Sequence, residues 1–351
     1  MPSQSADRTH RHAAPAGGAV AGDGPRLAVT GSIATDHLAT FPGRFTDQLL
    51  PGQLDHVSLS FLVDDLEIRH GGVAANIAFG LGRLGLKPLL IGAVGDDFDA
   101  YEVWLEGHGV DTEHVRGSSL QTARFMCTTD ADQNQIASFY AGAMAEASLI
   151  DLMPVLARPG GVELVLVSPN DPGAMLRHTA QCRTAGTPFA ADPSQQLARL
   201  SRDEVRELVS GARWLFTNEY EAALLLERTG WSRREVLERV GTWLTTRGAA
   251  GVRVESGRPA GAVEFPAVPA ATTVDPTGGG DAFRAGFLAC TTWGLTVHEA
   301  VPLGCALATA ALESVGPQQY DPRPAELLPR IEATYGATTA KRLLPHLQHL
   351  S

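Results

Sequence analysis

Asp275-Pro-Thr-Gly-Gly-Gly-Asp-Ala-Phe-Arg284 is the stretch that most constrains the fold of this chain. Its three consecutive glycines, Gly278 to Gly280, precede an apolar run, 282–293, with helical spacing, so Asp281 is expected in the first turn of a helix. Glycines at that point allow a ligand to approach the backbone closely. The free N–H groups in front of the helix and the positive end of its dipole then form a site for an anion.

A carboxylate beside an anion site has two interpretations. Asp281 is either a first-turn residue favoured by the helix dipole, or a general base that takes a proton from a hydroxyl. In the second case the amides of Gly278, Gly279 and Gly280 hold the transferred charge, which is the arrangement that phosphoryl transfer needs. This stretch alone leaves both interpretations open.

The composition limits the class of protein. With 351 residues, 44% of them hydrophobic, the chain can bury the core of one large α/β domain with a small appendage. Its net charge of −11 argues against nucleic acid and anionic membranes as partners. It has no apolar run as long as a membrane span and no signal-peptide core, which predicts a cytoplasmic protein. Residues 1–25 lack large apolar side chains and are expected to be a disordered tail.

The rarer residue types exclude two kinds of site. Neither lysine, Lys87 or Lys341, follows a glycine, whereas a Walker A loop needs Gly-Lys-Ser or Gly-Lys-Thr. The cysteines are scattered without paired spacing, which indicates core residues in a reducing compartment rather than zinc ligands or disulfides.

Short apolar strands recur along most of the chain. The first is 27–32, and 162–168, 188–192, 213–217 and 240–246 each follow a helical pattern. This alternation predicts a three-layer α/β/α domain with a mainly parallel central sheet. Ligands bind beyond the carboxyl ends of such strands. The polar residues there are candidates for a site: Ser32, Asp36, Asn170, Asp192, Gln195, Gln196, Asn218, Glu221, Thr246, Gly248 and Gly251.

A smaller β unit interrupts this pattern. Residues 57–63 alternate in polarity, and 123–128 and 135–140 flank a turn, which predicts one strand and one hairpin. If the turn is centred on Asp132, Phe125 lies opposite Phe139, with Cβ atoms roughly 5 Å apart. This pair either clasps a flat group such as a purine or forms the hydrophobic core of the lid. We assign 37–69 and 117–144 to an inserted β lid, and 26–36, 70–116 and 145–351 to the α/β domain.

A glycine pair, Gly71-Gly72, opens a further helix, in which Asn76 lies one turn from the start. The next glycines, Gly80-x-Gly82-x-x-Gly85, have the spacing of a dinucleotide-binding fingerprint, which must follow a strand and open a helix. These end a helix and precede a strand at 89–92, so we assign them to tight packing and a helix cap.

Together these motifs resemble the ribokinase-like (PfkB) family of carbohydrate and nucleoside kinases. The stretch 275–281 resembles its second signature, usually Asp-Thr-x-Gly-Ala-Gly-Asp, with departures at Pro276 and Gly279. Gly71-Gly72-x-x-x-Asn76 matches the first signature. The resemblance covers residues 26 to about 345 and is closest to bacterial adenosine kinases, in the segments 30–37, 57–65, 136–140 and 192–199.

The resemblance implies ATP-dependent phosphorylation of the 5′-hydroxyl of adenosine, with Asp281 as base and the amides of Gly278, Gly279 and Gly280 as anion hole. It implies Mg²⁺ and, as in some members, a monovalent cation such as K⁺. The implied substrate-binding residues are Ser32, Asp36, Ser60, Gly72, Asn76, Phe125, Phe139, Gln195, Gln196 and Arg199. Those implied for ATP are Asn218, Thr246, Gly248 and Gly251, with Glu221 for Mg²⁺ through water and Asp275, Thr277 and Ser314 for the monovalent cation.

Two alternative functions remain open. The same scaffold phosphorylates sugars and other nucleosides, although a sugar kinase has no need for an opposed aromatic pair. A nucleoside-binding sensor without catalysis is the second alternative, and retention of Asp281, the glycines and the Asn218/Glu221 pair argues against it.

The lid also bears on assembly. Its outward alternation is apolar, and members of the family pack two lids together around a two-fold axis. We therefore expect a homodimer joined lid to lid, and the alternative is a monomer whose lid is covered by its own body.

Overall fold

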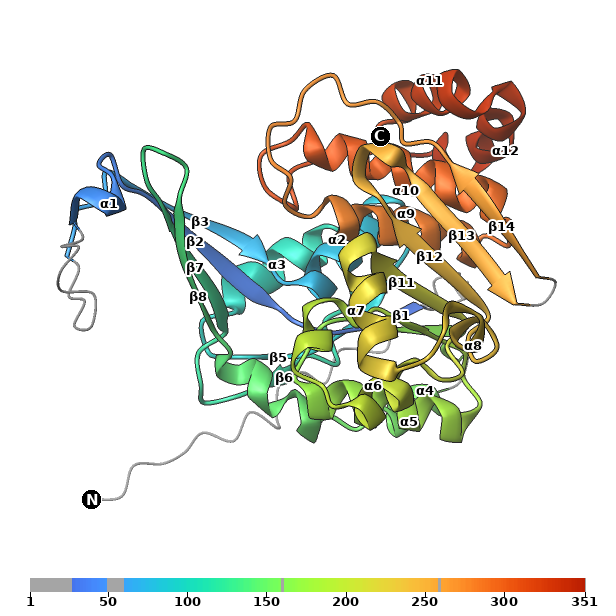
Figure 1. Ribbon diagram of the computed structural model, residues 1–351, viewed down its shortest axis with the longest axis horizontal. Coiled ribbons are helices and arrows are strands. Elements are labelled where there is room, and N and C mark those ends of the chain that lie inside the picture. Colours follow the sequence, from blue (N-terminus) through green and yellow to red (C-terminus); the bar gives the residue numbers. More distant parts are fainter. Residues whose placement is uncertain (1–26, 49–59, 159–160, 258–259, 351) are drawn as a thin grey trace, which may run out of the picture.

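The computed structural model describes residues 27–48, 60–158, 161–257 and 260–350, so the predicted tail at 1–25 lies outside the described residues. An eight-stranded sheet forms the centre of the body, in the order β14-β13-β12-β11-β10-β9-β1-β4 (Figure 1). The pairs from β4 to β12 are parallel, which confirms the mainly parallel sheet predicted from the strand pattern. The strands are β1 (Leu27–Thr30), β4 (Leu89–Ile91), β9 (Leu164–Val167), β10 (Phe189–Ala191), β11 (Trp214–Asn218), β12 (Thr242–Thr246), β13 (Val252–Gly257) and β14 (Ala260–Phe265).

One edge of the sheet differs from the prediction. β12, β13 and β14 form an antiparallel ladder that the helix–strand alternation does not anticipate. A short 3₁₀ turn, Gly248–Ala250, joins β12 to β13 without a crossover helix. An antiparallel partner needs only a tight connection, so no helical pattern precedes β13 or β14 in the sequence.

Helices cover both faces of the sheet (Figure 1). In β9, Leu164 and Leu166 belong to one buried cluster and Val165 and Val167 to another, as the alternation of side chains in a strand requires. The first cluster includes residues of α2 (Val73–Arg83), α3 (Asp99–Gly107), α9 (Gly279–Thr292), α10 (Val297–Leu312), α11 (Pro324–Tyr335) and α12 (Ala337–Leu347). The second includes residues of η1 (Gly142–Leu149), α4 (Met153–Leu156), α5 (Pro172–Ala185), α6 (Arg202–Val209), α7 (Glu219–Thr229) and α8 (Arg233–Leu237). No helix within the described ranges is long and apolar enough to cross a bilayer.

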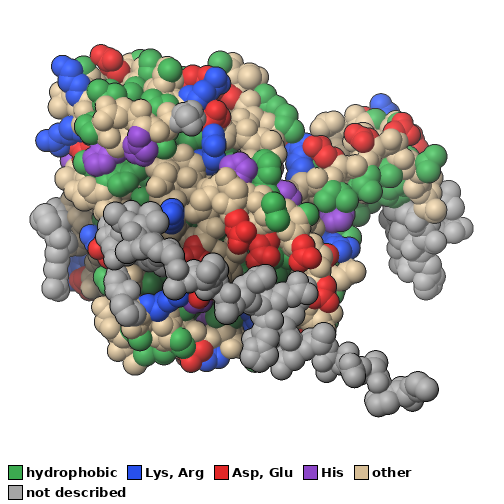
Figure 2. All heavy atoms as spheres, turned by 180° about the vertical axis from the view of Figure 1, so that it is seen from behind, with side chains coloured by type: hydrophobic (Ala, Val, Ile, Leu, Met, Phe, Trp, Pro, Cys, Tyr) green, Lys and Arg blue, Asp and Glu red, His purple; other side chains and the backbone are tan. Residues whose placement is uncertain are grey.

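A second sheet projects from one end of the body as the lid (Figure 1). Its strand order is β3-β2-β7-β8, with β2 (Ala34–Thr40) between β3 (Asp65–Gly71) and β7 (Ala123–Thr129), and β8 (Gln135–Tyr140) at one edge. The β7–β8 register pairs Phe125 with Phe139, which confirms the predicted hairpin alignment. Hydrophobic side chains gather along the lid in the space-filling view (Figure 2).

The strand predicted at 57–63 is wrong where the structure describes it. Residues 60–63 are outside any strand, 57–59 lie outside the described residues, and the partner of β2 is β3. Phe61 packs its ring against Phe41 and Phe45, with ring centroids 4.7 and 5.3 Å apart. Phe61, one of the apolar residues on which the strand was predicted, therefore belongs to an aromatic cluster at the end of the lid.

The glycines of the Gly80-x-Gly82-x-x-Gly85 pattern have packing roles, as predicted. A Cβ on Gly80 would lie 2.6 Å from the Cβ of Ala285 in α9, and one on Gly82 would lie 2.0 Å from the carbonyl oxygen of His108. Gly85 has a φ of +80° just after α2 ends. Close helix packing and a left-handed turn thus account for the pattern.

Candidate active site

The glycine-rich stretch begins α9 as predicted. Gly278 is the N-cap with a φ of +80°, and a Cβ there would lie 2.4 Å from Pro317, so glycine is required on both grounds. Asp281 lies in the first turn of the helix. The amides of residues 278–281 have no preceding helical turn to bond to, and they therefore offer donors to an anion next to this carboxylate.

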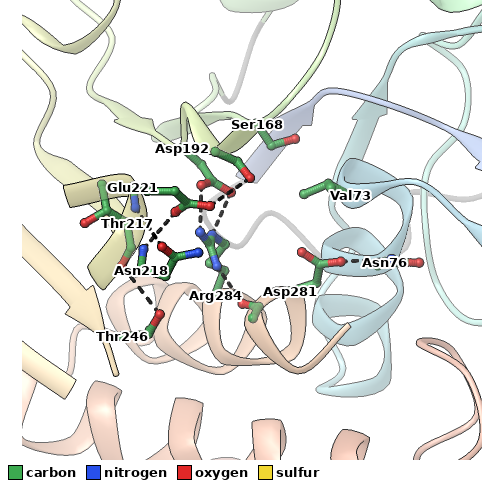
Figure 3. Close-up of polar contacts among 12 residues, drawn as sticks. Val73, Asn76, Ser168, Asp192, Thr217, Asn218, Glu221, Thr246, Asp281 and Arg284 are labelled. Carbon is green, nitrogen blue, oxygen red and sulfur yellow. Dashed lines mark hydrogen bonds and ion pairs between the residues drawn. The ribbon is translucent and has the colours of Figure 1, made fainter. Parts of the chain in front are cut away.

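A hydrogen bond joins the two sequence signatures. The Nδ2 of Asn76 in α2 donates to Oδ2 of Asp281 at 2.9 Å (Figure 3). Gln318 donates to Oδ1 of Asn76 at 2.8 Å, which directs the amide group of Asn76 towards Asp281. Gln318 is buried and also bonds to Tyr101 and Trp104. Sequence reasoning missed Gln318, because a single glutamine after a helix carries no motif.

Burial raises the pKa of Asp281 to about 6. The hydrogen bond from Asn76 and the charge of Arg284 oppose this shift, whereas the negative charges of Asp36 and Glu221 add to it. The carboxylate is therefore ionised at neutral pH yet more basic than an exposed aspartate. A general base works best with a pKa near the working pH, so this environment suits that role.

A buried ion pair links the same helix to Asp192, which follows β10. Arg284 donates through Nη2 to Oδ1 of Asp192 at 2.7 Å and through Nη1 to the carbonyl oxygen of Gly280 at 3.0 Å (Figure 3). Arg284 is 6% exposed and Asp192 1% exposed. Burial raises the pKa of Asp192, and the charge of Arg284 opposes that shift. The only sequence signal for this pair was an arginine inside an apolar helical run.

Asn218 and Glu221 form a capping box at the start of α7. The amide of Glu221 donates to Oδ1 of Asn218 at 2.8 Å, and the amide of Asn218 donates to Oε2 of Glu221 at 2.7 Å. Oε1 of Glu221 accepts from Ser194 at 3.1 Å. The pair therefore fixes a helix end beside the turn η2 (Ser194–Ala198), where the buried Glu221 carboxylate lies near Asp192 and Asp281 (Figure 3). No group of three or more potential metal ligands occurs in the described part of the chain.

A cavity of about 530 Å³ opens beside the glycines of α9. Its size is within the usual range for small-molecule sites. Thr246, Gly248 and Gly251, predicted as nucleotide-binding residues, line it together with Gly279 and Gly280. The remaining lining is mostly apolar, including Val268, Phe283, Cys305, Ala308 and Leu312. The structure thus places a pocket that can take a flat apolar group against the predicted anion site.

The lid contributes one continuous row of side chains. Asp36 pairs in register with Arg69 on one side and Phe125 on the other, and Phe139 follows Phe125, so all four share a face. Burial raises the pKa of Asp36 to about 6. Phe139 is 50% exposed, so it is available for contact with a ligand.

The other predicted substrate residues either have structural roles or make no hydrogen bond to Asp281 or Asn76 in the part of the chain that the structure describes. Ser32 accepts a hydrogen bond from the amide of Val73, and a Cβ on Gly72 would lie 2.6 Å from the backbone of Ala34. Gln196 is buried, and its Oε1 has no partner among the described residues. Ser60, Gln195 and Arg199 are exposed, and no hydrogen bond in the described structure links them to Asp281 or Asn76.

Asp275, Thr277 and Ser314, predicted to hold a monovalent cation, have hydrogen-bond partners within the protein. Asp275 accepts from Arg69 at 2.7 Å and from the amides of Gly316 and Thr277 at 3.0 and 2.9 Å. Ser314 donates to the carbonyl oxygen of Ala310 in its own helix at 2.9 Å.

Comparison with known proteins agrees with this geometry. The profile of the pfkB family carbohydrate kinases matches residues 30–324. The chain belongs to the PfkB family. It is 32% identical over 273 residues to a nucleoside kinase of Methanothermobacter thermautotrophicus, covering 76% of this chain and 86% of that protein. It is 28% identical over 281 residues to a cytidine kinase of Thermococcus kodakarensis, covering 75% of this chain and 96% of that protein.

Solved structures give the same result for the fold. The Burkholderia thailandensis nucleoside kinase in complex with inosine superimposes with a TM-score of 0.77 at 34% identity, covering 88% of this chain and 98% of that chain. The same protein in complex with ADP-inosine has a TM-score of 0.75 at 35% identity, and the match covers 88% of this chain and 96% of that chain. This chain is therefore a PfkB-family kinase with the ribokinase-like fold.

The buried ion pair leads to a stability prediction. Arg284→Met should lower the free energy of unfolding by about 3–5 kcal/mol, because it leaves the Asp192 carboxylate buried without a counter-charge. Urea unfolding followed by circular dichroism measures this. The double variant Asp192→Leu/Arg284→Met, which removes both charges, should recover most of the loss. The assignment would be contradicted if the double variant lost as much free energy of unfolding as Arg284→Met and Asp192→Leu lose together.

Proposed function

We propose that this kinase transfers the γ-phosphoryl group of ATP to the 5′-hydroxyl of a nucleoside, with adenosine as the first candidate substrate. The observation that carries the proposal is the hydrogen bond of 2.9 Å between Asn76 and Asp281, next to the glycine amides that begin α9. It brings a base, an amide that orients this base and an anion site together at one point. Nucleoside kinases among the matched proteins add support.

The base acts through position and pKa. Asp281 would align the 5′-hydroxyl and take its proton as the phosphoryl group arrives. The amides of residues 278–281 would stabilise the charge on the phosphoryl oxygens. Phosphoryl transfer passes through a loose transition state, so positioning and charge stabilisation supply most of the rate. Lid closure over the nucleoside would exclude water, which is the competing nucleophile.

The lid face provides a nucleoside subsite. Asp36, at the boundary between lid and body, is suited to accept hydrogen bonds from ribose hydroxyls. Phe125 and Phe139 continue the row of Asp36 across the two neighbouring strands, where an aromatic base can stack. Such a pair selects for a flat ring but not for one purine over another. Adenosine therefore rests on the resemblance of the sequence, and inosine is the main competitor.

ATP would occupy the cavity of about 530 Å³ lined by Thr246, Gly248 and Gly251. Mg²⁺ keeps several waters and needs one or two carboxylates beside the phosphates of its nucleotide. The buried carboxylate of Glu221, held by Asn218 and Ser194, fits this requirement through water. Bound Mg²⁺ would neutralise charge on the phosphates.

The outer face of the lid supports assembly as a homodimer. Leu66, Ile68, Met126, Ile136 and Tyr140 are exposed, and the register places all five on the face opposite Asp36 and Phe125. A contiguous apolar face of this kind is typical of an interface. Packing two lids around a two-fold axis would cover both copies of the face.

The base assignment leads to a prediction about turnover. Asp281→Asn keeps the size of the side chain but removes the proton acceptor, so kcat should fall by roughly 10²–10⁴ while nucleoside binding persists. In the parent, kcat/KM should fall as the pH decreases through about 6, because Asp281 becomes protonated there. Initial rates of ADP formation from roughly one pH unit below to two units above that pKa of about 6 measure both effects. Turnover of the Asn variant within a fewfold of the parent would refute the assignment.

Substrate class has a direct test. A panel of adenosine, inosine, guanosine, cytidine, ribose and fructose with ATP–Mg²⁺ should give the highest kcat/KM for adenosine. Phe139→Ala should weaken nucleoside binding by roughly 1–3 kcal/mol, the value of an aromatic stack on a base. Ile136→Ala, on the opposite face of β8, is the matched control and should bind as the parent does. Equal loss in both variants would assign Phe139 to lid packing instead.

Assembly is tested by mass. Light scattering at micromolar concentration should give twice the chain mass of 37.1 kDa. Ile68→Glu, in the apolar outer face, should reduce the mass to that of one chain, whereas Val103→Glu, at an exposed position on α3, should not. A parent protein that has the mass of a single chain would rule out the dimer.

A further inference from the structure

An arginine of the lid reaches the loop that precedes the catalytic helix. Arg69 lies in β3, and its Nη1 donates to Oδ2 of Asp275 at 2.7 Å. Its Cδ also lies 3.2 Å from the position of a Cβ on Gly316, so the side chain packs against that glycine. The guanidinium thus joins three segments that are far apart in the sequence, namely the lid strand, the loop before α9 and the loop after α10.

Asp275 organises the loop that leads into the anion site. Its Oδ1 accepts from the amide of Thr277 at 2.9 Å, and its Oδ2 accepts from the amide of Gly316 at 3.0 Å. Thr277 is followed directly by Gly278, the N-cap of α9. The position of the Asp275 carboxylate therefore determines where the first donor amides of the anion site lie.

The residues predicted for a monovalent cation do not fit one. Such a cation needs several oxygen atoms directed at a common point, but both oxygens of Asp275 already accept hydrogen bonds from protein donors. The hydroxyl of Ser314 is bonded to Ala310 within its helix. The guanidinium of Arg69 also places a positive charge at hydrogen-bond distance from Asp275, and it would repel a second cation there.

We propose that Arg69 is a positioning residue that takes the place of a monovalent cation at this loop. Its fixed charge neutralises Asp275 and holds the 275–278 loop in the conformation that presents the anion-binding amides. Turnover therefore requires no added K⁺. The inference rests on one part of the proposed function, namely that the amides positioned by this loop bind the phosphate of ATP.

The same arginine connects the two ends of the site. Arg69 is the register partner of Asp36, the residue assigned to the ribose hydroxyls, and its guanidinium donates to Asp275. A nucleoside held at Asp36 is thus one residue away from the group that fixes the phosphate loop. Because Arg69 moves with the lid, displacement of the lid would release Asp275.

A cavity beside this contact makes the proposal testable. A space of about 430 Å³ lies between β3 and residues 315–319, lined in part by Arg69, His70, Gly316 and Gln318. If the side chain at position 69 is shortened and uncharged, ions from solution can reach Asp275 through this space. A variant without the guanidinium should therefore respond to K⁺, whereas the parent should not.

The experiment compares the parent, Arg69→Gln and Arg124→Gln in potassium chloride and in tetramethylammonium chloride at equal ionic strength with fixed Mg²⁺. Arg124 is the matched control, since it also joins a lid strand to the body, through Asp97 at 2.7 Å, but on the other face of the lid. The parent and Arg124→Gln should have the same kcat in both salts. Arg69→Gln should lose about 10²-fold in kcat in tetramethylammonium, as expected when reacting groups are misplaced, and K⁺ should restore part of this loss.

Two results would overturn the proposal: activation of the parent by K⁺, or an Arg69→Gln variant with parental kcat in both salts. Melting temperatures in the two salts provide a readout that needs no turnover. The parent should gain no more than about 1 °C from K⁺, because it has no site for the ion, whereas a K⁺-specific rise in the parent would reveal one. If the parent phosphorylates no substrate of the panel, the proposed function fails, and the melting temperatures still decide the role of Arg69.

Discussion

The active site depends on how closely α2 and α9 approach each other. Gly80 of α2 faces Ala285 of α9, and a Cβ on this glycine would lie 2.6 Å from that of Ala285. Without the glycine the helices would separate by more than a hydrogen bond tolerates, since a bond of 2.9 Å joins Asn76 to Asp281 one turn away. The close packing of two helices thus sets the position of Asp281, the proposed base. Rigid elements hold such a position more accurately than loops do.

Charge at this site is balanced by two arginines in different ways. Arg284 is a buried residue of α9 that compensates the charge of Asp192 within the body. Arg69 is 20% exposed and comes from the lid, so in the mechanism proposed above its contact with Asp275 depends on lid position. Around them, Asp36 and Asp281 both have raised pKa values, because burial disfavours their ionised forms. The site therefore combines a fixed electrostatic frame with one contact that follows lid position.

The lid and the body satisfy different physical requirements. In the body, both faces of the central sheet are buried. Packing in the two hydrophobic clusters therefore fixes how distant segments of the body are placed. The lid is a single sheet with Asp36, Phe125 and Phe139 on one face and exposed apolar residues on the other. A sheet that buries neither face completely has few contacts to hold it in place, which is consistent with the lid closure proposed above.

The sequence by itself determined the features that depend on local pattern. Asp281 in the first turn of α9, the parallel strands β9 to β12 and the Phe125–Phe139 register all follow from periodicities and turns within a few residues. Only the tertiary structure decided the contacts between distant segments, such as Arg69 with Asp275, 206 residues apart, and Gln318 with Asn76, 242 apart. Neither Arg69 nor Gln318 belongs to a motif. Their partners are chosen by the docking of the lid and of the loop after α10, and no periodicity in the chain encodes which distant side chains that docking brings within hydrogen-bond distance.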